Sequence, residues 1–500
     1  MASVKSLAKD TAIYGCSSII GRFLNWCLVP LYTSMFAAAE YGIVTYVYSV
    51  VALALIILTY GMETGFFRFA NHEHYGENPR TVYSTALMSL GASSTLFFIL
   101  LMAFLGPVTR MLECGDHTSY VWMMGAAVAL DAFTAMPFSY LRFTNRALRF
   151  ATVKLINIGL NIGFNLFFIL ICPWLWEQAP GWIAWFYDPD FGIGYIFLAN
   201  FISSAATLLL LLPELKGFAW RFDAHLWRRM IVYSFPLLVL GIAGIMNQTI
   251  DKILLPVLVT DKADAMTQLG IYGANYKIAI VMVMFIQAFR FAYEPFIFAQ
   301  HRQEGNDSLR AYREAMKWFV IFSMFIFLGV MYYLDFIRYF ISPRYFSGLK
   351  VVPIVMIAEF FFGVFFNLSL WYKLTDRTIW GMWFSLIGLG VTIVLNVWLV
   401  PRMGYMGCAW AALGCYGVMM TASYLIGRIK HPIGYDVPRL TLYFVLAMGL
   451  YALSIVISTP HTWLNMAART LLLIIYVIFA LRHEHMTLSM LLPRRSRNNP

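Results

Sequence analysis

An arginine lies near the middle of an apolar segment that is long enough to cross a membrane. The segment covers residues 14–33 (YGCSSIIGRFLNWCLVPLYT) and contains Arg22. A cation at the bilayer centre costs about 2.5 to 3.5 kcal/mol on insertion scales, so we expect Arg22 to face protein or water. Asn25 lies on the same helical face, three residues later, and Pro30 loosens the helix further along. The segment is therefore predicted to turn a polar stripe toward a protein interior or a water-filled cavity.

Further ionisable side chains lie inside apolar segments of similar length, and charges at this depth usually pair or line a pathway. Gln287, Arg290 and Glu294 are spaced i, i+3 and i+7, which places them on one helical face. Arg290 and Glu294 are also four residues apart and can form an ion pair. The other ionisable residues of this kind are Glu63, Asp131, Asp251, Lys252, Lys277 and Glu359.

The balance of these charges indicates the sign of a cavity that they would line. Asp251 can be neutralised by Lys252 or by Lys277. Arg22 and the second lysine then keep no obvious partner, which predicts a positive cavity. Such a cavity suits an anionic cargo, because guanidinium and ammonium groups hold phosphate oxygens strongly where the dielectric constant is low.

A purely structural role for Arg22 is the alternative. Arg22 would then pair with Glu63 or Asp131 and lock helices together, and a buried ion pair by itself says little about function.

Acidic residues in the same segments are candidates for energy coupling or gating. Glu63 and Arg68 lie in GMETGFFRFA and could form a gate at the cytoplasmic mouth, although Arg68 is equally well explained as a positive-inside anchor. Proton or sodium coupling and use of the membrane potential all stay open. The coupling and gate candidates are Glu63, Arg68, Asp131, Asp251, Glu294 and Glu359.

The composition sets the class of protein. Of 500 residues, 61% are hydrophobic and only 12% are charged, and the mean hydropathy is +0.70. These values indicate a polytopic membrane protein. The net charge of +11 comes from basic residues scattered through short loops, so we expect no nucleic-acid partner.

Enzymatic chemistry has little support in the sequence. It contains no GxSxG, Walker or HExxH motif, and the six cysteines form no CxxC pair. We therefore expect a protein that is not an enzyme, with no catalytic residues, no cofactor and no metal site.

Apolar runs of about 20 residues predict an all-α protein with fourteen membrane-spanning helices. Lysine and arginine placement favours cytoplasmic termini, with 25 of the 36 basic residues on the side of the N-terminus and 6 opposite. The loop 338–350 departs from this bias. The predicted helices are near 11–36, 42–64, 81–106, 118–140, 152–172, 191–212, 230–259, 269–299, 315–340, 350–373, 380–400, 405–427, 440–458 and 463–481.

An internal repeat connects the two halves of the chain, although chance matching in apolar sequence is the alternative. An offset of six helices relates the halves, so they share one orientation and are predicted to be related by an axis along the membrane normal. We expect six-helix lobes at 1–215 and 216–430, followed by two extra helices and a basic tail at 431–500. The matching pairs are Asn25/Pro30 with Asp251/Pro256, Gly42/Tyr48 with Gly270/Tyr276, and Gly159/Asn165 with Gly390/Asn396.

Several of these stretches resemble the polysaccharide-biosynthesis flippases of the multidrug, oligosaccharidyl-lipid and polysaccharide exporter superfamily. The resemblance covers nearly the whole chain. It is carried by KSLAKDTAIYGCSSIIGRFLNWCLVPLYT, EYGIVTYVYS, TYGMETGFFRFA, NQTIDKILLPVL, GIYGANYKIA and LNVWLVPRMGYMGCAWAAL.

The resemblance implies a V-shaped cavity between two lobes and alternating-access transport of undecaprenyl-diphosphate-linked oligosaccharide across the inner membrane. This transport would serve surface polysaccharide such as lipopolysaccharide. Lys252 stands where family members often have arginine, so bidentate phosphate binding is not expected from it. The implied partners are the lipid-linked oligosaccharide, membrane lipid, a glycan polymerase and glycosyltransferases, with the protein itself a monomer. The substrate-binding candidates are Arg22, Asn25, Lys252, Lys277 and Arg290.

Other functions stay open at this point. A cation-coupled multidrug exporter of the same superfamily should show unpaired acids in its cavity. A peptidoglycan-precursor flippase is a close variant, and a non-transporting scaffold for glycan-assembly enzymes would need no central charges.

Overall fold

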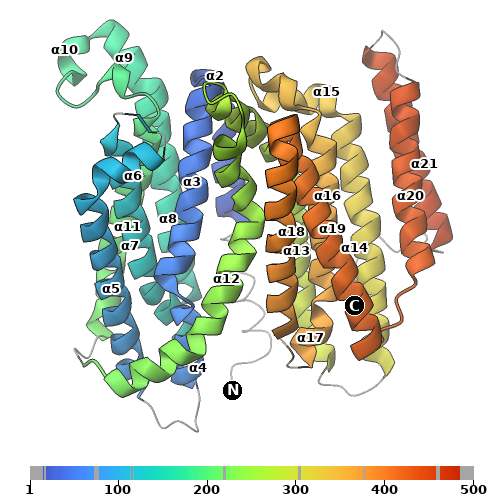
Figure 1. The fold of residues 1–500 in the computed structure, drawn as a ribbon, viewed down its shortest axis with the longest axis horizontal. Helices are drawn as coiled ribbons and strands as arrows, with labels where there is room; N and C mark the ends of the chain where they lie inside the picture. The colour runs from blue at the N-terminus through green and yellow to red at the C-terminus, as the bar shows by residue number, and fades with distance from the viewer. Residues whose placement is uncertain are drawn as a thin grey trace, which may run out of the picture.

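The computed structural model describes residues 19–71, 78–217 except 113 and 116, 221–301, 306–457 except 376 and 378, and 462–484, together with Gly15. Within these ranges the protein is built of helices and contains no strand (Figure 1). The predicted all-α fold is confirmed.

The helices have the following bounds in chain order. They are α2 (Val29–Met35), α3 (Ala38–Thr59), α4 (Met62–Asn71), α5 (Pro79–Ala103), α6 (Leu105–Met111), α7 (Thr118–Phe143), α8 (Ala147–Leu166), α9 (Cys172–Gln178), α10 (Pro180–Ile183), α11 (Gly194–Leu211), α12 (Ala224–Leu258), α13 (Ala265–His301), α14 (Asn306–Tyr332), α15 (Leu334–Ile337), α16 (Val351–Leu368), α17 (Leu370–Leu374), α18 (Ile379–Met403), α19 (Tyr405–Lys430), α20 (Val437–Val456) and α21 (Thr462–His483). A π-helical segment, η2 (Phe167–Ile171), joins α8 to α9, and short 3-10 segments are η3 (Pro189–Phe191), η4 (Leu212–Gly217), η5 (Arg338–Phe340) and η6 (Pro343–Gly348).

Thirteen stretches of the described chain are long and apolar enough to cross a membrane, and they match the second to fourteenth predicted helices one to one. The first predicted helix, 11–36, begins outside the described residues. Its described part is helical over 19–26, turns at Cys27 and Leu28, and continues as α2. Pro30 is the second residue of α2, and it has no backbone N–H to donate to the Trp26 carbonyl oxygen across the turn, which explains the interruption.

The positive loop 338–350 hides no additional membrane-spanning helix. It folds into η5 and η6. The Arg344 guanidinium and the Tyr345 hydroxyl both donate hydrogen bonds to the carbonyl oxygen of Phe36, at 3.2 and 3.0 Å. One of its basic residues therefore has a structural partner at the corner between α2 and α3.

Polar side chains mark where several of the helices begin. Asn78 accepts a hydrogen bond from the Arg80 N–H at the start of α5 (2.9 Å), with Pro79 in the first turn. Asp223 accepts from the Leu226 N–H at the start of α12 (2.9 Å). Such caps satisfy backbone donors that have no partner within the helix.

The helices form two groups, with α12 running obliquely from one to the other (Figure 1). The first bundle consists of α3, α5, α7, α8 and α11, and the second bundle consists of α13, α16, α18 and α19. α14 packs on α13 and α16 and contacts α20 and α21 on its other side.

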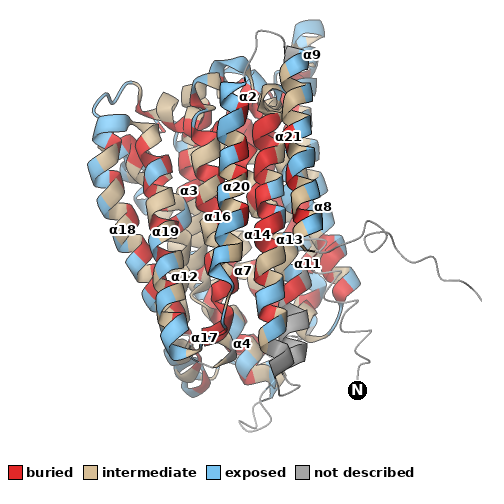
Figure 2. Ribbon diagram, turned by 90° about the vertical axis from the view of Figure 1, so that its right-hand side faces the viewer, coloured by how far each residue is buried: buried red, intermediate tan, exposed pale blue. Residues whose placement is uncertain are grey.

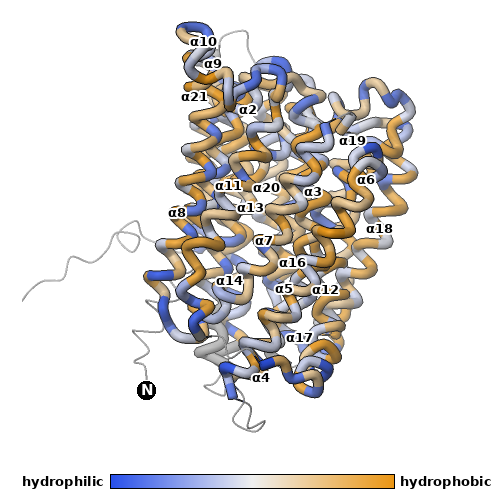
Figure 3. Tube along the Cα trace, turned by 90° about the vertical axis from the view of Figure 1, so that its left-hand side faces the viewer, coloured by the Kyte–Doolittle hydropathy of each residue, from blue (hydrophilic) through white to orange (hydrophobic). Residues whose placement is uncertain are grey.

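Burial and hydropathy follow the pattern of a membrane protein. Exposed positions lie on the outward faces of helices such as α12, α18 and α21 (Figure 2). Many of them are large apolar side chains, such as Val394 and Val456. Hydrophilic residues gather toward the two ends of the molecule, with apolar ones between them (Figure 3). The apolar outer surface is the one expected to face lipid.

The two bundles meet where α3 crosses α13. A Cβ atom added to Gly42 would lie 1.9 Å from the Met266 carbonyl oxygen, and one added to Gly270 would lie 1.8 Å from the Ala38 carbonyl oxygen. Only glycine fits at either position. Met266 precedes Gly270 by four residues, and Ala38 precedes Gly42 by four residues. The contact is therefore pseudo-symmetric, and it relates corresponding residues of the predicted repeat.

A second pair of repeat residues also plays matching roles. Asn165 on α8 and Asn396 on α18 are both fully buried. Each side-chain amide donates to the carbonyl oxygen four residues earlier, that of Asn161 at 2.7 Å and that of Thr392 at 2.8 Å. These matching contacts agree with the predicted repeat.

A further contact lies between α4 and α12. A Cβ on Gly65 would lie 2.8 Å from the Ser234 hydroxyl oxygen, and this hydroxyl donates to the Gly61 carbonyl oxygen (3.3 Å). Gly61 has φ +70°, a left-handed conformation that favours glycine. This contact joins α4 to the first half of α12. It lies at the opposite end of α3 from Gly42.

The last two helices are fastened to α14 through one carboxylate. Glu484 lies just after α21 and accepts from the Lys317 ammonium (2.7 Å), the Arg439 guanidinium (2.8 Å) and the Tyr443 hydroxyl (2.6 Å). Its side chain is only 3% exposed. This arrangement connects α14, α20 and the end of α21 at one point.

Candidate functional site

A cavity of about 950 Å³ lies between the two bundles. Its walls come from the segment 19–26, from α3, α7, α8 and α11 of the first bundle, and from α12, α13 and α16. Along α3 its lining runs from Tyr41 to Thr59, between the Gly42 and Gly61 contacts. The predicted central cavity is thus present.

The cavity brings together eight of the predicted site residues. Two others do not line it: Asp251 lies behind the wall, and Arg68 lies outside it with its guanidinium 4.2 Å from the Tyr233 ring centre. The Glu294 side chain lies outside the described residues, so the predicted Arg290–Glu294 pair stays a prediction. The eight that line the cavity are Arg22, Asn25, Glu63, Asp131, Lys252, Lys277, Arg290 and Glu359.

Arg22 faces this cavity and makes no hydrogen bond or ion pair to any described residue. The segment that carries it is attached to α13, because the Trp26 indole donates to the Lys277 carbonyl oxygen at 2.7 Å. Trp26 also stacks on Phe340, with ring centres 4.0 Å apart. A Cβ on Gly21 would lie 2.6 Å from the Ile158 side chain, so the segment that carries Arg22 packs on both α13 and α8 at the edge of the cavity.

Neither of the two carboxylates considered as partners of Arg22 forms an ion pair with it in the described part of the chain. Glu63 is paired with Arg142 on α7, with 2.6 Å between nitrogen and oxygen, and also accepts from the Ser139 hydroxyl (3.0 Å). Asp131 lines the cavity with Ser204 and Lys154 as its polar and charged neighbours, and it forms no ion pair within 4 Å among the described residues. Arg142 and Lys154, which the sequence placed with the cytoplasmic charges, reach the cavity from the ends of α7 and α8.

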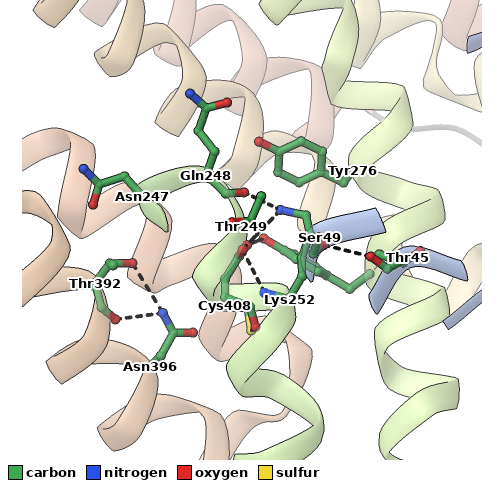
Figure 4. A network of polar contacts seen from close by, with 12 residues as sticks. Thr45, Ser49, Asn247, Gln248, Thr249, Lys252, Tyr276, Thr392, Asn396 and Cys408 are labelled. Carbon is green, nitrogen blue, oxygen red and sulfur yellow. Dashed lines mark hydrogen bonds and ion pairs between the residues drawn. The ribbon is translucent and has the colours of Figure 1, made fainter. Parts of the chain in front are cut away.

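Lys252 forms the ion pair with Asp251. Its ammonium lies 3.2 Å from the Asp251 carboxylate and donates to the Gln248 carbonyl oxygen at 2.9 Å (Figure 4). Tyr272 donates to the same carboxylate at 2.6 Å. The lysine without a carboxylate partner among the described residues is consequently Lys277.

Two of the remaining three predicted residues, Glu359 and Arg290, contact aromatic side chains, and the third, Asn25, lines the cavity close to Arg22 in the sequence. Glu359 on α16 accepts a hydrogen bond from the Tyr276 hydroxyl. The Lys252 ammonium lies over the Tyr276 ring, 4.2 Å from the ring centre. The Arg290 guanidinium lies 3.4 Å from the Phe366 ring centre. The described lining contains six basic and three acidic side chains, so its overall sign is positive.

A neutral polar wall on α8 and α11 was missed by the sequence reasoning. Asn157 and Asn161 lie on one face of α8, and Asn200, Ser203, Ser204 and Thr207 lie on one face of α11; all six line the cavity. Their helical spacing (i, i+4 and i, i+3, i+4, i+7) is visible in the sequence and was the available signal.

The described residues contain no group of three or more side chains suited to hold a metal ion. The side chains that line the cavity offer cations for an anion, and amides and hydroxyls for polar neutral groups.

Three solved structures with a similar arrangement of helices are a lipid flippase and two multidrug transporters. The lipid II flippase MurJ in an inward closed conformation has a TM-score of 0.73 at 13% identity, covering 95% of this chain and 99% of MurJ. A MATE multidrug resistance transporter of the MOP superfamily in an inward-facing conformation has a TM-score of 0.66 at 12% identity, covering 82% and 94%. The MATE multidrug transporter DinF-BH has a TM-score of 0.62 at 17% identity, covering 85% and 96%. At these identities the similarity shows the fold alone.

The fold is thus that of the flippases and transporters of the MOP superfamily. Residues 7–301 match the family model described as polysaccharide biosynthesis protein. Comparison of the sequence with curated proteins gave no match. The chain belongs to the polysaccharide biosynthesis protein family.

Proposed function

We propose that this protein is a flippase that moves undecaprenyl-diphosphate-linked oligosaccharide across the inner membrane by alternating access. The observation that carries the proposal is the pair of cavity cations, Arg22 and Lys277, that lack carboxylate partners among the described residues. Glu63 and Asp251 are each paired with another cation. A desolvated cation without a counterion is costly unless a ligand supplies the negative charge. A diphosphate supplies that charge.

In this proposal the diphosphate binds between Arg22 and Lys277, and Lys252 and Arg290 add positive potential. The glycan occupies the rest of the cavity, and the prenyl chain stays in lipid. The lobes at 1–215 and 216–430 would rock about the cavity, with 431–500 as an addition to the second lobe. Cytoplasmic termini, a monomeric protein, and a glycan polymerase and glycosyltransferases as partners belong to the same proposal.

The test replaces the two unpaired cations. We expect Arg22→Ala and Lys277→Ala each to lower surface glycan display by about tenfold or more, because each removes a charge-assisted contact to the diphosphate. Protein in the membrane should stay near the normal amount. Glycan display is measured by lectin or antibody staining, and protein by immunoblot.

Arg110→Ala is the matched control, since Arg110 is exposed on α6 and lies outside the cavity. Normal glycan display in both cavity variants would contradict the proposal. Loss of the protein itself would instead indicate a structural role for the cations.

Two alternatives are tested in the same cells. Asp131 and Glu359 line the cavity and could couple a multidrug exporter to a cation gradient. Greater sensitivity to cationic dyes with normal glycan would favour that function. A block in lipid II translocation with normal surface glycan would favour a peptidoglycan-precursor flippase.

A further inference from the structure

The lining of the cavity is divided into two chemically different parts. Arg22 and Lys277 stand on the side formed by the segment 19–26 and α13. A second part, on α8 and α11 with Tyr48 of α3, carries mainly neutral polar groups together with Lys154. It adjoins the segment 19–26, because a Cβ on Gly21 would lie 2.6 Å from the Ile158 side chain of α8. We call Tyr48, Asn157, Asn161 and Asn200 the amide wall; all four line the cavity.

The amide N–H groups of the amide wall are used within the protein. Asn157 donates to the Thr207 hydroxyl (2.7 Å) and the Ser203 carbonyl oxygen (3.1 Å), and Asn200 donates to the Tyr48 hydroxyl (3.0 Å). Within the described part of the chain, the amide oxygens of Asn157 and Asn200 receive no hydrogen bond. Neither is among the buried polar atoms that lack a partner, so both oxygens are accessible. The wall therefore presents fixed carbonyl acceptors, and the Tyr48 hydroxyl adds a donor.

Helix packing alone does not account for the wall. Asparagine and serine do join membrane helices by hydrogen bonds. The repeat, however, places Gly388 and Thr392 of α18 at the positions that correspond to Asn157 and Asn161 of α8. Neither residue of α18 lines the cavity. The same fold is thus built in the second bundle without these amides, and the amide wall belongs to one side only.

We propose that the amide wall is a carbohydrate subsite that binds the first sugars of the lipid-linked glycan, next to the diphosphate on the cationic side. This inference rests on the proposed function. Sugar hydroxyls and N-acetyl groups are neutral and donate hydrogen bonds, which matches fixed carbonyl acceptors and a phenolic hydroxyl. A cavity of about 950 Å³ has room for both parts of such a headgroup.

The experiment compares two lipids that differ only in the sugar. Binding of undecaprenyl diphosphate and of undecaprenyl diphosphate bearing one N-acetylglucosamine is measured on the purified full chain in nanodiscs, by tryptophan fluorescence. Asn157→Leu and Asn200→Leu should weaken binding of the sugar-bearing lipid by about fivefold or more, and binding of the sugar-free lipid by less than about twofold.

Tyr48→Phe covers the case in which the asparagine variants do not fold, because it removes only a hydroxyl and should give the same selective loss. Thr249→Val is the control: Thr249 lines the cavity from α12 and donates only to the Ile245 carbonyl oxygen of its own helix. It should change neither affinity. Equal weakening of both lipids, or of neither, in the variants that fold would overturn the carbohydrate subsite.

Arg22→Ala separates this inference from the proposed function. It should weaken both lipids to a similar extent, because both carry the diphosphate. If Arg22→Ala weakens both and the wall variants do not discriminate, the subsite is wrong and the flippase proposal stands. If Arg22→Ala changes neither lipid, the diphosphate site is wrong whatever the wall variants show.

Discussion

Single residues decide which cation of the site is available to a ligand. The sequence predicted that one of two lysines pairs with Asp251 and could not say which. Lys252 follows Asp251 directly, and its long side chain folds back so that the ammonium reaches the carboxylate (3.2 Å). Lys277 stands on α13, where Tyr272 already donates to the same carboxylate. Residue spacing gave the alternatives, and only the packing of α12 on α13 decides between them.

The ion pair between Asp251 and Lys252 is expected to stabilise the folded protein. Asp251→Asn should lower the free energy of unfolding by about 3 kcal/mol, because it leaves the largely buried Lys252 ammonium without its counterion. Asp251→Asn combined with Lys252→Met should recover part of the loss. Thermal unfolding of the purified protein in detergent measures both. Identical melting temperatures for the single and double variants would argue against a buried pair.

At the scale of helices, the length of apolar runs was enough to locate the membrane-spanning segments. It could not locate their ends, because polar residues continue a helix past the apolar run; α12, expected from residue 230, begins at Ala224 beside its Asp223 cap. It also could not show that the first helix is interrupted at Cys27. The amide wall escaped notice because an asparagine in a membrane helix can equally join two helices or face a cavity.

The attachment of α20 and α21 gives a prediction with a pH dependence. Burial alone would raise the pKa of Glu484, but hydrogen bonds and charge from Lys317, Tyr443 and Arg439 outweigh it and hold the pKa below its usual range. A carboxylate with a lowered pKa stabilises the folded state above its unfolded-state pKa of about 4.3, and this stabilisation disappears as the pH falls through the lower folded value.

Glu484→Gln should therefore lower the melting temperature at neutral pH, and its difference from the unaltered protein should shrink below about pH 4. The measurement is thermal unfolding of both proteins across this pH range. Glu314→Gln is a suitable control, because Glu314 is half-exposed and also contacts Lys317 (2.6 Å). A difference that is constant with pH would show that the carboxylate charge is not what fastens these helices.

At the scale of the whole molecule, the α3–α13 crossing is one of the places where the two bundles are in contact. The sequence repeat had already singled out both of its glycines. The sequence did not show that Gly42 and Gly270 contact each other's helices, one in each bundle. Beyond the glycines, a Cβ on Gly273 would lie 3.3 Å from the Thr45 Cβ and 2.6 Å from its hydroxyl oxygen. Two cysteines at these positions are close enough for a disulfide.

We expect the Thr45→Cys, Gly273→Cys variant to lose transport when oxidised and to regain it when reduced, because the cross-link keeps the bundles together at this crossing. Glycan display before and after reductant is the measurement, in a background in which the exposed Cys27 is replaced by serine. Each single cysteine variant is the control. Transport by the fully cross-linked protein would show that the bundles do not separate here.

The course of α12 has a mechanical consequence. Its first half packs on α4 and α5, and its second half is bonded to the second bundle, where Asn247 donates to the Ser385 carbonyl oxygen and Tyr416 donates to that of Asn247. The two bundles therefore cannot tilt apart unless α12 bends or loses its contacts with one of them. Pro236 and Pro256 each delete a rung of its hydrogen-bond ladder, so its compliance is concentrated there. If the bundles rock as proposed, the stiffness of α12 at these two prolines would contribute to the energy of the movement.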